Sequence, residues 1–235
     1  WAISLPAIDL LQDGDLYGPV QLKANGGGAE VVRPQLEIGN LDVDVVFDPQ
    51  QRTTSGKVAI ASIRQAGPGA LTAPLALSAT LVPTANQLVA DFDLAGAGRQ
   101  LVVRGRVEQD LDAGAGKARF QMQSLEFTPE TPLLGTLFPF LKENRIVATE
   151  GRAGLQGRAD WSGQGLQTSL DLKLENVSIA NNTAGAACLT GTIRLKGPPF
   201  ETAEVEELSM ALLNIGLQLG SGEVRYRLQR QQMLT

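Results

Sequence analysis

The segment Leu170-Asp171-Leu172-Lys173-Leu174-Glu175 decides the fold, because apolar and charged residues alternate in it without exception. Every second side chain of a β-strand points to the same face, so its three leucines share one face and its three charged residues share the other. Similar alternation is found in the segments 41–47 and 153–161, and it recurs from about residue 19 to about residue 229. The sequence therefore predicts a long series of strands with one apolar and one polar face.

We expect an all-β protein, a large curled antiparallel sheet (a groove or β-taco) of about twelve or more strands. Glycine and proline fall mostly between the alternating runs, where hairpin loops would place them. We expect Gly26–Gly28 to be the turn between a strand at 20–24 and a separate strand at 32–38. The alternation breaks at 132–141, where leucines follow the spacing of one helix face. We expect one short helix there, kinked or ended by Pro139.

This break predicts three segments along the chain. Residues 1–131 would form a first β-groove segment, 132–143 a short helical insertion, and 144–235 a second β-groove segment. The chain begins at Trp1 without an initiating methionine, so we expect a piece of a longer protein.

Composition excludes several classes of function. The net charge is −5, and the basic residues are spread singly, without the cluster that nucleic acid requires. The chain contains no histidine, which removes the common catalytic triads and zinc sites. Its one cysteine, Cys188, lies next to Leu189 and is expected to be a buried, inert thiol. The glycine-rich run 112–117 lacks the first glycine of a phosphate loop and indicates a hairpin turn. We expect no enzyme, no cofactor and no metal site.

Something must cover the apolar face, because large exposed apolar patches are rare in soluble proteins. What covers it bears on the function. Open twisted sheets of more than about ten strands curl, split into two layers or close. A curled sheet would form a trough lined by Leu, Val, Ile and Ala, which suits acyl chains. A split sheet would form a closed β-sandwich, a structural, adhesive or scaffold domain with no small ligand. Alternation alone leaves both interpretations open.

Three stretches carry a resemblance to a known family. They are Asn144 to Trp161, the strand Leu170 to Asn176, and Ile215 to Leu228, which contains Gly216-Leu217-Gln218-Leu219-Gly220-Ser221-Gly222-Glu223-Val224-Arg225-Tyr226-Arg227. These stretches resemble the AsmA-like clan, and the last of them resembles its YdbH-type branch. The resemblance covers about residues 140–230.

The resemblance implies a central periplasmic segment of a bridge-like protein that is anchored in the inner membrane of Gram-negative bacteria. Such proteins are thought to move phospholipids to the outer membrane along a hydrophobic β groove. The implied partners are phospholipid, neighbouring segments of the same parent chain, and a small outer-membrane lipoprotein that adds strands to an open sheet edge. The family offers no catalytic residues to transfer to this chain.

Our leading hypothesis is therefore a lipid-binding segment that moves phospholipids between the inner and outer membranes. The candidate groove residues are Val43, Val45, Leu88, Phe92, Leu101, Val103, Phe120, Leu170, Leu172, Leu174, Leu217, Leu219, Val224 and Tyr226. A soluble carrier of small anions, which an older dicarboxylate label for the family suggests, ranks last. Such a carrier needs converging basic groups, whereas Arg104, Arg106, Arg152 and Arg158 fall on the polar strand faces.

Overall fold

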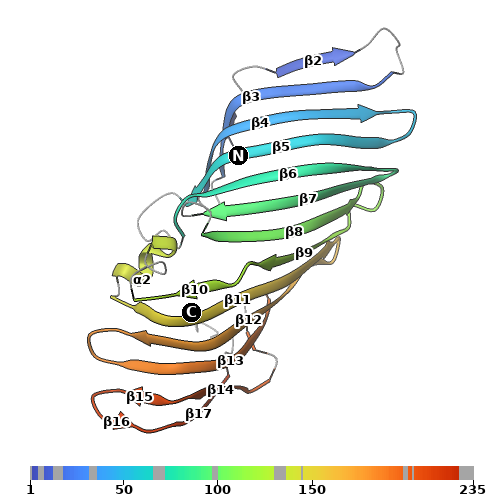
Figure 1. Ribbon diagram of the computed structural model, residues 1–235. Coiled ribbons are helices and arrows are strands. Elements are labelled where there is room, and N and C mark those ends of the chain that lie inside the picture. Colours follow the sequence, from blue (N-terminus) through green and yellow to red (C-terminus); the bar gives the residue numbers. More distant parts are fainter. Residues whose placement is uncertain are drawn as a thin grey trace, which may run out of the picture. The chain divides into compact units, whose positions relative to one another are not determined.

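The chain has 235 residues, and those that the structure describes fold mainly into antiparallel strands (Figure 1). The computed structural model describes residues 2–4, 8–12, 18–31, 36–65, 72–96, 100–129, 136–143, 145–197, 201–202 and 204–227. Its backbone contacts define two compact units, of which unit 1 ends at Arg119 and unit 2 begins at Phe120. The described residues contain 17 strands and one short helix, so the predicted all-β class is confirmed. The division into segments 1–131, 132–143 and 144–235 stays a prediction.

Unit 1 is an antiparallel meander. Its strands are β1 (Ala2–Ser4), β2 (Ile8–Gln12), β3 (Val20–Val31), β4 (Leu36–Asp48), β5 (Thr53–Gln65), β6 (Leu75–Thr84), β7 (Gln87–Gly96) and β8 (Leu101–Asp110). Strands β1 and β2 both pair with β3, and each later strand then pairs with the next one along the chain. No pairing within the described part of unit 1 returns from β8 to the first strands, so this sheet is open. Strand β9 (Gly116–Met122) contains the boundary between the units.

Unit 2 continues the antiparallel pattern and adds the helix. Its elements are β10 (Leu125–Phe127), α2 (Pro139–Glu143), β11 (Val147–Ser162), β12 (Gly165–Ala180), β13 (Gly185–Gly197), β14 (Glu206–Met210), β15 (Leu212–Asn214), β16 (Gln218–Leu219) and β17 (Gly222–Tyr226). Pairing runs in order from β10 to β13. Strand β13 then pairs with both β14 and β15, which pair in turn with β17 and β16.

The helix occupies the predicted place, and it is interrupted directly before Pro139, in agreement with the predicted kink. Thr136 and Leu137 are helical, Phe138 interrupts, and Pro139 opens α2. Proline suits a first helical position because its missing N–H has no partner to lose there, and its fixed φ fits a helix. Residues 131–135, on which the predicted start of the helix falls, lie outside the described residues.

Two compensating bulges bend neighbouring strands of unit 1. Ala24 and Gly27 of β3 pair with Val43 and Leu41 of β4, so β3 carries one extra residue at this level. One step further along, the extra residue is in β4, at Asn40. Gly26 has φ 74° and Asn40 has φ 53°, the left-handed conformation that these two residue types adopt most readily.

These bulges correct two expectations from the sequence. The run Gly26–Gly28 reads as a hairpin turn, but β3 passes straight through it to Val31. Leu36 and Ile38, expected in a separate strand with Val32, belong to β4, which continues through Asn40 to Asp48. A bulge mimics a turn in the sequence because it also needs residues that tolerate positive φ, yet it bends the strand without reversing it.

A similar pair of compensating bulges occurs in β12 and β13 of unit 2. Leu174 and Val177 pair with Gly191 and Leu189, which places the extra residue in β12, at Asn176. The extra residue then changes to β13, at Cys188. Their φ values are 52° and 57°. Cys188 was expected to be buried, but it lies inside β13 and is half-buried. Because bulges bend and twist strands, both units carry the feature that curls a sheet.

Candidate functional site

The apolar residues of unit 1 lie in rows across neighbouring strands. One row consists of Val43, Val58, Ala79 and Phe92, each directly opposite the next. Directly opposite residues of antiparallel strands point to the same face. The register accordingly places six predicted groove residues on one face of unit 1: Val43, Val45, Leu88, Phe92, Leu101 and Val103.

Unit 2 has a matching face built around the segment that decides the fold. Leu172 lies opposite Leu155 on one side and Ile193 on the other. Leu170 and Leu174 flank it on the same strand face. The paired bulges keep this face in phase, because they bring Val177 to the side of Leu174 although the two are three positions apart.

The remaining predicted residues of unit 2 divide into two groups. Gly191, Leu208 and Val224 form one cross-strand row, so Val224 and, two positions on, Tyr226 join the apolar face. Phe120 contacts Gly157 of β11, and Leu219 pairs with Leu213. Leu217 differs from these because it lies in the tight turn closed by the Ile215 N–H and the Leu217 carbonyl, with 73% of its surface exposed.

These faces are open. Across β4 to β8 the apolar-face residues are mostly half-buried, whereas a closed sandwich would bury them fully. In unit 2, Leu155, Leu170, Leu172, Leu174 and Ile193 are half-buried as well.

The opposite faces are polar and charge-paired. In unit 1, Arg104 and Arg106 donate to Asp93 and Asp91, their direct cross-strand partners, each at 3.0 Å. In unit 2, Arg152 bonds Glu126 at 3.3 Å. The predicted placement of these arginines on polar faces is thereby confirmed, and no basic cluster free to bind a small anion is found among the described residues.

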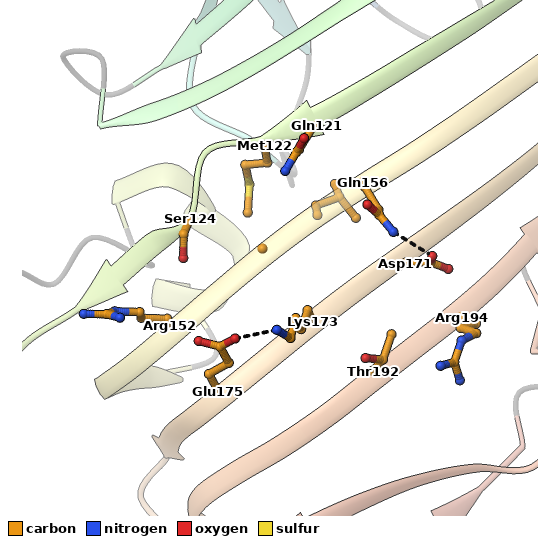
Figure 2. A pocket seen from close by; sticks show the side chains of 12 residues that line it. Gln121, Met122, Ser124, Arg152, Gln156, Asp171, Lys173, Glu175, Thr192 and Arg194 are labelled. Atoms are coloured by element: carbon orange, nitrogen blue, oxygen red, sulfur yellow. Dashed lines mark hydrogen bonds and ion pairs between the residues drawn. The ribbon is translucent and has the colours of Figure 1, made fainter.

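One hollow in unit 2 lies on this polar face (Figure 2). It has a volume of ≈ 390 Å³, and the missing side chain of Gly154 helps to make it, because nothing lies within 4 Å of a β-carbon built there. Lys173 donates to Glu175 at 2.7 Å and Gln156 to Asp171 at 3.0 Å, as the dashed lines in Figure 2 mark. The Lys173 ammonium lowers the pKa of Glu175, first by this hydrogen bond and then by its charge. The hollow thus contains paired charges and no converging ligand set.

A second hollow in unit 2 is apolar. It has a volume of ≈ 240 Å³ and lies beyond the β12 and β13 bulges, lined by Ile146, Ile179, Ala184, Ala186 and Leu213. Sequence reasoning missed these residues, and it missed Leu155 and Ile193 as well. Their alternation was visible, but only the register shows which of them meet across strands.

No group of three or more metal-ligating side chains occurs among the described residues. None of the helices within the described ranges is long and apolar enough to span a bilayer.

A family model described as "YdbH-like: Intermembrane phospholipid transport protein YdbH" matches residues 3–235. No curated protein and no solved structure matches the chain.

Proposed function

Because the chain belongs to the YdbH-like family of intermembrane phospholipid transport proteins, we propose that its two apolar sheet faces hold phospholipid acyl chains. The chain is then a lipid-binding segment of a periplasm-spanning protein that moves phospholipids between the inner and outer membranes. Each acyl chain lies along a hydrophobic β groove, with no covalent chemistry, and passes from one row of aliphatic side chains to the next.

The openness of the apolar faces is the observation that carries this proposal. Leu172 lies in register with Leu155 and Ile193, and Leu170 and Leu174 flank it on the same strand face, yet all three leucines stay half-buried. Covering an apolar surface with acyl chains is favourable by about 25 cal/mol per Å² removed from water. The same openness counts against the alternative of a closed β-sandwich scaffold.

We also propose a cellular location for the parent chain and two protein partners for its groove. The parent chain is anchored in the inner membrane, and neighbouring segments of that chain extend the groove. A small outer-membrane lipoprotein adds strands to an unpaired sheet edge, where free N–H and C=O groups provide the template. The protein is not an enzyme in this proposal, and it needs no cofactor.

Organic extraction of the purified chain followed by mass spectrometry tests lipid binding, with an unrelated β-sandwich as the blank. We expect near-stoichiometric phospholipid that is absent from the blank. A photo-crosslinking amino acid at position 172 should then capture that lipid, whereas the same group at position 173, on the opposite face, should not. A clean extract together with no crosslink at position 172 would reject the proposal.

A further inference from the structure

Gly157 of β11 has a neighbour in the space where a side chain would stand. It lies on the apolar face of unit 2, directly opposite Leu170. A β-carbon built on Gly157 would collide with the Cζ atom of Phe120, and it would lie 2.7 Å from the Leu170 Cδ2 atom. The ring of Phe120 therefore occupies the notch that the glycine leaves.

Unit 1 contains the same arrangement. Gly105 of β8 lies directly opposite Phe92 of β7, and a β-carbon on Gly105 would be 2.6 Å from the Phe92 Cε1 atom. Both phenylalanines are half-buried. In each unit a phenylalanine ring on the apolar face thus lies low against a glycine of another strand.

We propose that the contact between Phe120 and Gly157 determines which acyl chains the groove accepts, a proposal that rests on the proposed function. The backbone of Gly157 is fixed by its pairing with β12, and Leu170 closes the notch from the side. An added methyl group would have to push the ring away from the sheet, into the space that an acyl chain fills. The position of the Phe120 ring therefore determines how much space remains above the sheet for an acyl chain. Phe120 and Gly157 thereby select for slender, unbranched chains.

Competition between two probes measures this selectivity. One probe is a phosphatidylethanolamine with two straight acyl chains, and the other carries a pyrene at the end of one chain. The 235-residue chain is loaded from vesicles that contain both probes in equal amounts, and the ratio of bound pyrene lipid to bound straight-chain lipid is measured.

Gly157→Ala should lower the pyrene-to-straight ratio about tenfold, which is the usual discrimination by a small change of volume in an apolar site. Phe120→Ala, which removes the ring, should raise the ratio above that of the wild type. Adding Phe120→Ala to Gly157→Ala should restore the ratio. Gly154→Ala is the matched control, because it adds the same methyl group to the same strand where nothing lies within 4 Å.

The outcomes separate this inference from the proposed function. If the wild type takes up neither probe, the proposed function fails and the inference fails with it. If the wild type is loaded and neither Gly157→Ala nor Phe120→Ala changes the ratio, the inference alone is overturned. Should Gly157→Ala not fold, Phe120→Ala decides, since it only removes atoms: an unchanged ratio rejects the inference and a raised ratio supports it.

Discussion

The hydroxyl of Ser178 accepts a hydrogen bond from the backbone N–H of Cys188 at 3.1 Å, so β12 directly supports the bulge in β13. The same hydroxyl donates to the Glu150 carboxylate of β11 at 2.7 Å. Ser178 is nearly buried, with 8% of its surface exposed. One side chain therefore joins three neighbouring strands at the level where they bend.

Ser178→Ala should destabilise the chain by about 1–3 kcal/mol, because a bulge amide and a carboxylate both lose their partner. Chemical denaturation measures the loss. Ser169→Ala is the control, since its hydroxyl makes no hydrogen bond to the described residues and lies in the same strand. Equal stability of the two variants would mean that the bulge holds without its side-chain support.

Leu172→Asp should reduce recovered phospholipid about tenfold or more, equivalent to about 1.4 kcal/mol or more. A carboxylate on the apolar face keeps its water and repels acyl chains. Mass spectrometry of the extract measures loading, and circular dichroism checks the strands. The control Thr192→Asp places the same charge on the polar face, opposite Lys173. Global unfolding of Leu172→Asp alone would instead indicate a closed core.

The pair formed by Lys173 and Glu175 should make stability depend on pH in the acidic range. The pKa of Glu175 in the folded chain lies below the usual 4.5 of glutamate, because the Lys173 ammonium stabilises the ionised carboxylate. The contribution is therefore fully present above the unfolded pKa and is lost as the pH falls through the lowered folded pKa. An NMR titration of Glu175 should show its pKa moving up in Lys173→Met. The pKa of Glu108, paired with Lys117, should stay unchanged in that variant.

Tyr226→Phe should be neutral or stabilise the chain by up to about 1 kcal/mol, because the buried hydroxyl has no hydrogen-bond partner among the described residues. Burial raises the pKa of Tyr226, and the Glu206 carboxylate opposite it adds to this. The unfolded chain then ionises first, so this residue weakens folding as the pH rises through 10.0. An ultraviolet titration of Tyr17→Phe, which leaves Tyr226 as the only tyrosine, measures the shift. A marked loss of stability in Tyr226→Phe would reveal a partner for the hydroxyl.

The alternation of apolar and polar residues predicted the strands well, because an unbroken period of two is typical of a β-strand with one apolar and one polar face. Leu170 to Glu175 and Leu75 to Leu81 lie in strands with the expected faces. Bulges escaped prediction because a run such as Gly26–Gly28 tolerates a turn and a bulge equally. Asn40 and Asn176 offered a signal, a residue that accepts positive φ at a slip in phase. Cys188 offered none, since cysteine does not favour that conformation.

The candidate site was predicted as a face but not as a set of contacts. Leu172 and Val45 could be assigned to the apolar side from their own strands alone. The positions of the Phe92 and Phe120 rings depend on which glycine lies beside each ring. That neighbour is set by the register between strands, which one strand's own pattern does not show. The turn that contains Leu217 was not predicted, because the two-residue strand next to it carries too few residues to show a period, and the role of Leu217 in the groove stays a prediction.

The paired bulges also constrain how this chain can change over evolutionary time. Deleting Asn176 alone would leave the extra residue of β13 uncompensated and turn the rest of β12 over, so that aliphatic side chains would face water. Deleting Asn176 and Cys188 together would straighten both strands and keep their pairing. Lineages should therefore gain or lose Asn176 and Cys188 together. The lengths of two neighbouring bulged strands are therefore expected to change together during evolution.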